Sequence, residues 1–232
     1  MTAKLAIKQL LGLSPKIRKQ TATATEHHGS AYGGWTIKKD SLNCNSTIIS
    51  AGIGNDISFD LSLITKYHAT IIGIDPTPQV EDWLLRQKIP GSFKFLPIGL
   101  SNEDGEAKFY KPINEHHISH SINPVTKMST DFITVPILSL SAIMLNNMLT
   151  HIDLLKMDIE GFEYVVIKDI VNEEILIHQL LIEFHHGLYG FTNRDTVNAI
   201  SLLNTVGYKI FSISETGREI SFINSTTKSF QN

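Results

Sequence analysis

From residue 46 to residue 206 the sequence alternates between short runs of β-branched residues and longer segments in which apolar residues recur every three or four positions. Residues 46–51, STIISA, and residues 70–75, TIIGID, predict two buried strands. Residues 56–67, between them, have the spacing of an amphipathic helix. Such alternation implies parallel strands joined by right-handed crossovers. We therefore predict an α/β fold with a mostly parallel, doubly wound sheet.

The remaining predicted elements continue the pattern to the end of the chain. The further strands are 92–96, 107–110, 132–135, 152–158, 179–184, 208–212 and 219–224, and the further helices are 78–88, 139–148, 163–171 and 194–206. The last two strands are joined without a helix, so we expect an antiparallel hairpin at one edge of the sheet. Ligands of doubly wound sheets bind at the carboxyl ends of the strands, where functional residues should be sought.

The composition restricts the class of protein. With 232 residues the chain is long enough for one α/β domain. The formal net charge of −3 argues against a general nucleic-acid partner, which needs a basic surface. Cys44 is the sole cysteine, which excludes an intrachain disulfide and a cysteine-based zinc site. No apolar stretch approaches the roughly 18 residues of a membrane span, and we expect a cytoplasmic protein.

The N-terminal part of the sequence differs from the rest. Residues 1–20 alternate lysines with apolar residues, and we expect a helix, packed on its own domain or lying on a membrane or a partner. Residues 21–34, TATATEHHGSAYGG, are small, polar and rich in glycine, which predicts a flexible connection. The chain is therefore divided into residues 1–34 and one α/β domain, residues 35–232.

The first predicted strand ends at Gly52-Ile53-Gly54, a turn that lets a ligand approach the backbone. Glycine accepts the backbone angles of such a turn, and the helix that follows offers free N–H groups. Asp75 ends the next predicted strand, where a carboxylate can accept hydrogen bonds from the hydroxyls of a ribose. The combination predicts a nucleotide-like cofactor, against the alternative of an ordinary turn that binds nothing.

Two residues separate the candidate cofactors. Ile57 stands where the dinucleotide fingerprint requires a third glycine. Asp56 lies at the start of the predicted helix, where its negative charge is unfavourable for a pyrophosphate. S-adenosylmethionine carries an ammonium and a sulfonium, which an acidic turn attracts. We therefore favour S-adenosylmethionine over NAD or NADP.

A second group of polar residues ends two later strands. The stretch KMDIEG contains Lys156, Asp158 and Glu160, and strand alternation places the first two on the same side. Glu183 and His185 share one face at the end of the next strand. Because the carboxyl ends of parallel strands meet at one edge, we predict that Asp158, Glu160, Glu183 and His185 form the catalytic site, with Lys156 supporting Asp158.

Two roles remain open for this group. His185 can act as a general base with an orienting carboxylate. Alternatively, the imidazole and the carboxylates can hold magnesium or manganese. We favour the site without a metal. Glu163, at the start of a predicted helix, is expected to do no more than stabilise that helix.

The sequence resembles the FkbM-like methyltransferases. The strings that carry the resemblance are SAGIGNDISFDLSLITKYHATIIGIDPTP, FLPIGLSNEDGEAKFY, IDLLKMDIEGFEYVVIKDI and LLIEFHH, in that order. The second strand ends in Asp-Pro-Thr-Pro, as in one branch of the family. The resemblance implies a Rossmann-like class I methyltransferase fold for residues 35–232, S-adenosylmethionine as cofactor and, as in many members, methylation of hydroxyl groups on sugars or natural products.

The resemblance also implies cofactor-binding residues. Ser50 stands where methyltransferases commonly place an acidic residue that holds the ammonium of the donor, and Asp56 is expected to take over part of that role. Pro76 belongs to the Asp-Pro-Thr-Pro string. Leu100 lies in the segment that usually borders the adenine and is expected to pack against the ring.

We therefore predict an S-adenosylmethionine-dependent O-methyltransferase with a small-molecule or glycan acceptor. The alternatives are a non-catalytic S-adenosylmethionine-binding scaffold and an NAD(P)-dependent oxidoreductase on the same type of sheet. Acceptor specificity is expected from residues 111–130 and from the N-terminal segment. The sequence does not indicate an oligomeric state.

Overall fold

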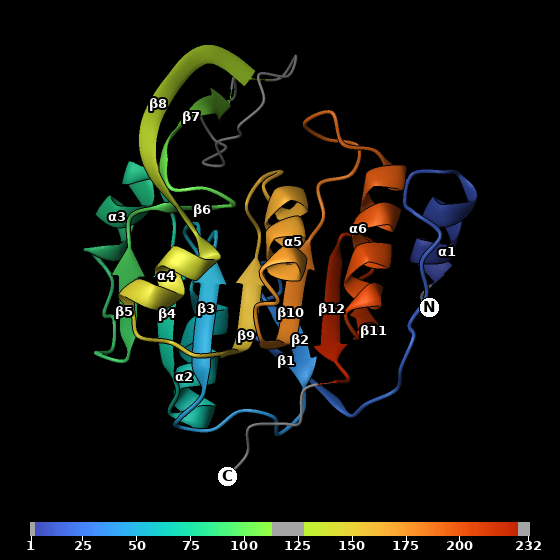
Figure 1. Cartoon of the computed structure of the whole chain (residues 1–232), viewed down its shortest axis with the longest axis horizontal. Coiled ribbons are helices and arrows are strands. Elements are labelled where there is room, and N and C mark those ends of the chain that lie inside the picture. Colours follow the sequence, from blue (N-terminus) through green and yellow to red (C-terminus); the bar gives the residue numbers. More distant parts are fainter. Residues whose placement is uncertain (1–2, 113–127, 227–232) are drawn as a thin grey trace.

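The computed structural model describes residues 3–112 and 128–226, with a seven-stranded sheet at the centre (Figure 1). Its strand order is β11-β12-β10-β9-β3-β4-β5. The bounds of these strands are β3 Thr47–Ala51, β4 Thr70–Ile74, β5 Phe93–Leu96, β9 Ile152–Met157, β10 Ile177–Glu183, β11 Tyr208–Ile213 and β12 Glu219–Asn224. The strands from β10 to β5 are parallel, whereas β12 runs antiparallel to both β10 and β11. The predicted sheet and its antiparallel C-terminal hairpin are therefore confirmed.

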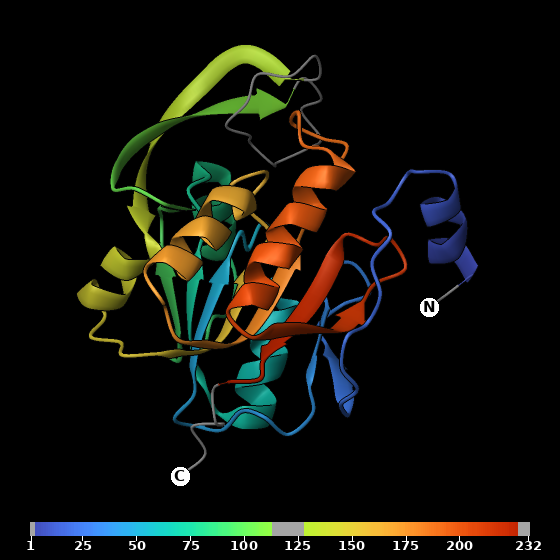
Figure 2. The ribbon, with the colours of Figure 1, turned by 45° about the vertical axis from the view of Figure 1, so that its right-hand side comes forward.

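Helices cover both faces of this sheet (Figures 1 and 2). One face carries α4 (Leu140–Asn146), α5 (Glu163–Asn172) and α6 (Asn193–Thr205), and the other carries α2 (Ser58–Tyr67) and α3 (Pro78–Leu84). The central strands divide their side chains between the two cores: Leu155 and Leu180 pack under α5 and α6, and Leu154 and Leu181 pack under α2. Burial on both faces explains why most side chains of these strands are apolar.

A two-stranded hairpin completes the face that carries α2. Strands β1 (Thr25–His28) and β2 (Trp35–Lys38) pair antiparallel. The backbone N–H of Lys38 donates to the side chain of Gln179 in β10 at 2.9 Å, and this bond fixes the hairpin on the sheet. Residues 25–28 were expected to belong to a flexible connection, and that prediction is wrong for these residues. They form a strand because the hairpin packs on α2 and β10, a tertiary contact that local sequence does not show.

The N-terminal helix is shorter than expected. Helix α1 (Ala3–Leu10) lies beside the β11 edge, and its Leu5 is buried against the turn at Gly217. The ammonium of Lys8 donates to the carbonyl of Thr216 at 3.2 Å. These contacts favour packing on the protein's own domain. None of the helices in the described part of the chain combines the length and apolar character that spanning a membrane requires.

A three-stranded sheet rises beyond the carboxyl ends of the central strands (Figures 1 and 2). It consists of β6 (Gly99–Ser101), β8 (Met128–Ser139) and β7 (Gly105–Pro112), in that order. The sequence did not predict β6, and β8 is longer than the predicted strand. Residues 113–127, on which part of the expected acceptor specificity falls, lie outside the described residues.

Glu26 joins β1 to α2 through a compact polar cluster. Its carboxylate accepts hydrogen bonds from Lys66 and Tyr67 and lies 3.1 Å from Nε2 of His28. Burial alone would raise the pKa of Glu26, but its bonds with Lys66, Tyr67 and His28 lower it to about 2. The ionised carboxylate is therefore the form that holds the hairpin on the helix.

Replacing Glu26 by Gln should lower the free energy of unfolding near neutral pH, by about 1 kcal/mol. Because the pKa of Glu26 falls from 4.5 to about 2 on folding, its contribution is complete above pH 4.5 and is lost as the pH approaches 2. Urea unfolding at a series of pH values should show the two proteins converging on acidification. Glu81→Gln, at an exposed position of α3, is the control. A difference between wild type and Glu26→Gln that is constant with pH would contradict the assignment.

Candidate active site

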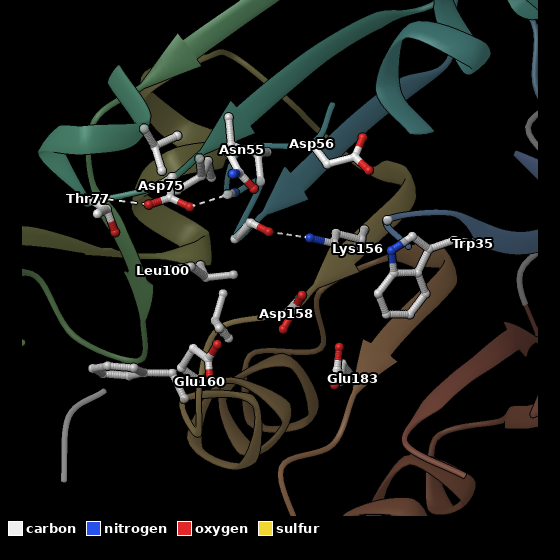
Figure 3. Close-up of a pocket in the computed structure, with 18 of the residues that line it drawn as sticks. Trp35, Asn55, Asp56, Asp75, Thr77, Leu100, Lys156, Asp158, Glu160 and Glu183 are labelled. Carbon is white, nitrogen blue, oxygen red and sulfur yellow. Dashed lines mark hydrogen bonds between the residues drawn. The ribbon is translucent and has the colours of Figure 1, made fainter. Parts of the chain in front are cut away.

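The carboxyl ends of β3, β4, β9 and β10 open onto one cavity of about 850 Å3 (Figure 3). Four polar or glycine residues mark these ends: Gly52 after β3, Asp75 after β4, Asp158 after β9 and Glu183 at the end of β10. They lie together because parallel strands end at the same edge of the sheet. The cavity is therefore where the sequence predicted the functional residues to meet.

Most of the predicted site residues line this cavity. The ten that do so are Gly52, Gly54, Asp56, Asp75, Pro76, Leu100, Lys156, Asp158, Glu160 and Glu183. Ser50 is buried within β3 and does not line the cavity, and its role at the cofactor stays a prediction. His185 lies behind the lining, next to Asp158 and Glu160.

Gly52 brings the turn after β3 into direct contact with β9. Its φ of +73° favours glycine, and a Cβ atom added there would lie 1.7 Å from the carbonyl oxygen of Asp158. The Gly52 N–H donates to the carbonyl of Ile74 at 2.8 Å. The Gly52 carbonyl accepts a hydrogen bond from the ammonium of Lys156 (Figure 3). No other residue type fits between these neighbours.

Asp75 fixes the shape of the glycine turn. One carboxylate oxygen accepts from the N–H of Gly54 at 2.9 Å, and the other accepts from the N–H of Thr77 at 2.9 Å. Burial raises the pKa of Asp75, although these two bonds oppose the rise. Each oxygen of a carboxylate can accept a second hydrogen bond. Asp75 thus braces the turn and keeps acceptor capacity toward the cavity.

Asp56 connects the start of α2 to the loop between β1 and β2. Its carboxylate accepts from the hydroxyl of Ser30 at 2.6 Å and from the N–H of Ser58 at 2.8 Å. Burial would raise the pKa of Asp56, but the bonds from Ser30 and Ser58 lower it, so the group is ionised at neutral pH. The same loop brings residues 31–35 to the cavity wall. Asp56 therefore places a negative charge at the start of α2, as the sequence predicted. It also holds the loop between β1 and β2, which forms one wall of the cavity.

Lys156 is buried in the central strand β9 and has partners on several sides. Besides the Gly52 carbonyl, its ammonium lies 5.8 Å from the ring centroid of Trp35. It also lowers the pKa of two carboxyls, the buried Asp60 and the partly buried Asp158, against the effect of burial, which raises both. The prediction that Lys156 supports Asp158 is consistent with this electrostatic contact, but its hydrogen bond goes to the glycine turn.

The carboxylates beyond β9 and β10 surround His185. Its Nδ1 lies 2.5 Å from Glu163, which is fully buried. Its Nε2 lies 3.2 Å from Glu160 and 3.7 Å from Asp158. Glu163 also accepts from the N–H of Gly161 at 3.0 Å. Glu163 therefore does more than stabilise the start of α5, because it orients the imidazole.

This environment sets the charge of the imidazole when no cation is bound. Burial would lower the pKa of His185, but Glu163, Glu160 and Asp158 raise it to about 10. Burial raises the pKa of Asp158, and repulsion from Glu160 and Glu163 adds to the rise. Burial also raises the pKa of Glu183, where repulsion from Asp158 adds to the rise. A positively charged His185 cannot accept a proton, which argues against the general-base role considered for it.

Sequence reasoning missed several parts of the wall. Tyr32 in the loop between β1 and β2 lines the cavity, and so does Trp35 at the start of β2. On the C-terminal hairpin, the lining residues are Thr216 in the turn and Glu219 at the start of β12. The glycines of TATATEHHGSAYGG were a signal for a loop near a ligand, but they were interpreted as a linker. Thr216 and Glu219 carry no such signal.

Replacing Gly52 by Ala should destabilise the fold by at least about 2 kcal/mol, since the new methyl group meets the Asp158 carbonyl and the positive φ is strained. Gly91→Ala is the matched control, because a Cβ there meets nothing within 4 Å. It should change the free energy of unfolding by less than about 0.5 kcal/mol. Urea unfolding of both variants measures the difference, and equal values would contradict the described contact.

The family model described as the methyltransferase FkbM domain matches residues 18–210. No curated protein matches the sequence.

Solved structures with related folds include three methyltransferase or fibrillarin chains. The methyltransferase FkbM from Methylobacillus flagellatus KT has a TM-score of 0.48 and 12% identity, over 78% of this chain and 44% of that one, so this chain spans less than half of its length. Methanococcus jannaschii fibrillarin, a pre-rRNA processing protein, has a TM-score of 0.50 and 9% identity, over 92% and 88%. Aeropyrum pernix fibrillarin, solved with natively bound S-adenosyl-L-methionine, has a TM-score of 0.44 and 11% identity, over 91% and 85%.

The fold and the family match agree. The seven-stranded sheet with its inserted antiparallel strand is the Rossmann-like class I methyltransferase fold that the resemblance implied. The Asp-Pro-Thr-Pro branch stays a prediction. The family match covers most of the chain, including every residue at the carboxyl ends of β3, β4, β9 and β10 that lines the cavity. The chain therefore belongs to the FkbM methyltransferase family, with S-adenosylmethionine as its cofactor.

Proposed function

We propose that this protein transfers a methyl group from S-adenosylmethionine to a hydroxyl oxygen of a neutral, hydroxyl-rich acceptor, such as a sugar, a glycan or a natural product. The observation that carries the proposal is the two-sided cavity. Its β3–β4 side is a glycine turn braced by Asp75, and its β9–β10 side presents the carboxylates of Asp158 and Glu183 (Figure 3). A cofactor on the first side and an acceptor on the second would then meet within this one cavity.

The residues on the β3–β4 side fit the cofactor. A Cβ at Gly54 would meet nothing within 4 Å, so its backbone is open to a ligand. Asp75 would accept hydrogen bonds from the ribose, and Leu100 would pack against the adenine. Asp56 would attract the ammonium. When bound, the cofactor supplies an electrophilic methyl group on a positively charged sulfur.

The residues on the β9–β10 side suit a hydroxyl nucleophile. Carboxylates accept hydrogen bonds from hydroxyl groups, and Asp158 and Glu183 approach from neighbouring strands. Holding the hydroxyl against them would orient its oxygen toward the cofactor side, and orientation is a large part of the barrier to a displacement reaction. As the oxygen–methyl bond forms and the methyl–sulfur bond breaks, one of the two carboxylates would take the hydroxyl proton. These two side chains are therefore the proposed catalytic residues.

The charge of the cavity disfavours anionic acceptors. Lys156 is the one basic side chain among the described residues of the wall, and its ammonium is bonded to the Gly52 carbonyl. Six acidic residues line the same cavity: Asp56, Asp75, Asp158, Glu160, Glu183 and Glu219. A phosphate group placed there would be repelled. This argues against an RNA acceptor, although one related fold belongs to a pre-rRNA processing protein.

A non-catalytic scaffold would bind the same cofactor without transferring its methyl group. That alternative gives no role to the partly buried carboxylates of Asp158 and Glu183, which are costly to keep in a binding module. The family match gives no support to the NAD(P)-dependent oxidoreductase. Methyl transfer to a hydroxyl is thus the function that the site supports best.

The test is a screen for transfer of a trideuteromethyl group from labelled S-adenosylmethionine, read by mass spectrometry. We expect labelled methyl ethers on sugar or polyol acceptors and none on RNA. Asp158→Asn should lower kcat by about 100-fold or more and change the dissociation constant of the cofactor by less than about twofold. Glu173→Gln, exposed after α5, is the control. Unchanged turnover in Asp158→Asn, or labelling confined to RNA, would contradict the proposal.

A further inference from the structure

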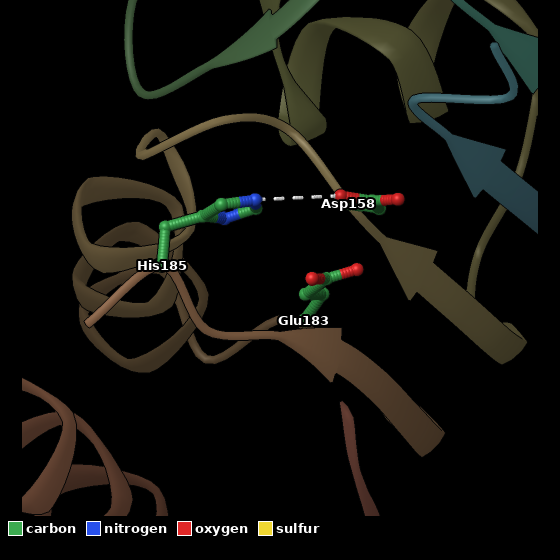
Figure 4. A group of neighbouring side chains, drawn as sticks. All are labelled: Asp158, Glu183 and His185. Carbon is green, nitrogen blue, oxygen red and sulfur yellow. Dashed lines mark ion pairs between the residues drawn. The ribbon is translucent and has the colours of Figure 1, made fainter. Parts of the chain in front are cut away.

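We propose that Asp158, Glu183 and His185 form a binding site for a divalent cation of the magnesium or manganese type. The three side chains come from the ends of β9 and β10 and from the loop after β10, and they point toward one space (Figure 4). One ligand atom of each lies within 4.8 Å of those of the other two. Ligands that surround one cation at about 2.1 to 2.4 Å lie no farther apart than this.

His185 is oriented as a ligand would be. The contact of its Nδ1 with fully buried Glu163 favours the tautomer with the proton on Nδ1, which leaves the lone pair on Nε2. Nε2 faces two carboxylates, Glu160 at 3.2 Å and the proposed ligand Asp158 at 3.7 Å. Histidines that bind metals typically donate their other ring N–H to a carboxylate in this way, which fixes the ring and raises its basicity. Glu163 would thus be a positioning residue for the cation.

Glu163 is itself held in place. Its carboxylate accepts from the N–H of Ile159 at 3.3 Å and from the N–H of Gly161 at 3.0 Å. Both donors belong to the turn that follows Asp158. The same turn therefore positions one proposed ligand, Asp158, directly and a second, His185, through Glu163.

Negative charge at the site exceeds what the protein supplies to balance it. Asp158, Glu160, Glu163 and Glu183 lie around one imidazole, and Lys156 is a further cation that acts on Asp158, so four carboxylates face two positive charges. Within residues 3–112 and 128–226, no group donates a hydrogen bond to the Glu183 carboxylate. A divalent cation would supply both the missing charge and a partner for Glu183.

The donor set points to a hard cation. Two carboxylates and one imidazole suit magnesium or manganese, which also keep water molecules as ligands. A water position on such an ion is where an acceptor hydroxyl would bind, and this consequence rests on the proposed function. Binding of the cation itself requires neither the cofactor nor the acceptor.

The alternative is that His185 carries a proton and pairs with Asp158 and Glu160 without any metal. The two states differ in one measurable respect. In the first, an imidazole nitrogen coordinates the ion, and in the second no ion binds at micromolar concentration.

The experiment uses the full chain, freed of metal with a chelator, and titrates it with Mn2+ followed by electron paramagnetic resonance and calorimetry. We expect one site, with nitrogen coupling from His185 in pulsed spectra. Glu183→Gln and Asp158→Asn should each weaken Mn2+ binding at least about tenfold, and Glu163→Gln by about 10- to 100-fold. Glu219→Gln removes a charge from the same cavity without removing a ligand and should stay within about twofold.

Circular dichroism of each variant separates loss of the site from loss of the fold. Absence of Mn2+ binding below millimolar concentration, or equal affinity in wild type and Glu183→Gln, would overturn the inference. Methyl transfer that persists in excess chelator by a protein that does not bind Mn2+ would overturn it while leaving the proposed function intact. Site-specific Mn2+ binding without transfer to any hydroxyl would uphold the inference and contradict the proposed function instead.

Discussion

The hydrogen bond from the buried ammonium of Lys156 to the Gly52 carbonyl holds together the two strands around which the cavity is built. A buried ammonium without a partner costs several kcal/mol, so the turn after β3 has to present its carbonyl to β9. That position leaves no room for a side chain at Gly52, whose missing Cβ would overlap the Asp158 carbonyl. The two halves of the cavity thus meet at one backbone contact.

Each half of the cavity uses charge in a different way. On the cofactor side, the carboxylates of Asp75 and Asp56 are bonded to backbone and hydroxyl groups and shape the walls. On the acceptor side, Glu163 performs that structural task for His185, which leaves Asp158 and Glu183 directed at the cavity. In the turn between β9 and α5, Glu160 adopts a positive φ of 52° and accepts a hydrogen bond from the hydroxyl of Tyr189. Backbone strain of this kind concentrates at functional sites.

The sequence predicted the elements whose signals are local. Strands such as Thr70–Ile74 and Ile152–Met157 are buried on both faces and are therefore mostly apolar, and Asp75 and Asp158 were placed correctly because they follow these strands directly. Strand Thr25–His28 escaped prediction, because TEHH has no strand pattern and owes its conformation to packing on α2. The pairing of Glu163 with His185 joins residues 22 positions apart in the chain, and alternation within a strand cannot reveal it. Ser50 was named from the family resemblance, and its burial within β3 is a result of packing that the resemblance does not show.

The division of the cavity into a cofactor side and an acceptor side is the central claim, and a crystal structure with S-adenosylhomocysteine tests it most directly. The account predicts ribose oxygens within hydrogen-bond distance of Asp75, the adenine against Leu100 and the sulfur facing Asp158 and Glu183. Adenosine bound among the carboxylates of β9 and β10, or outside the cavity, would contradict it.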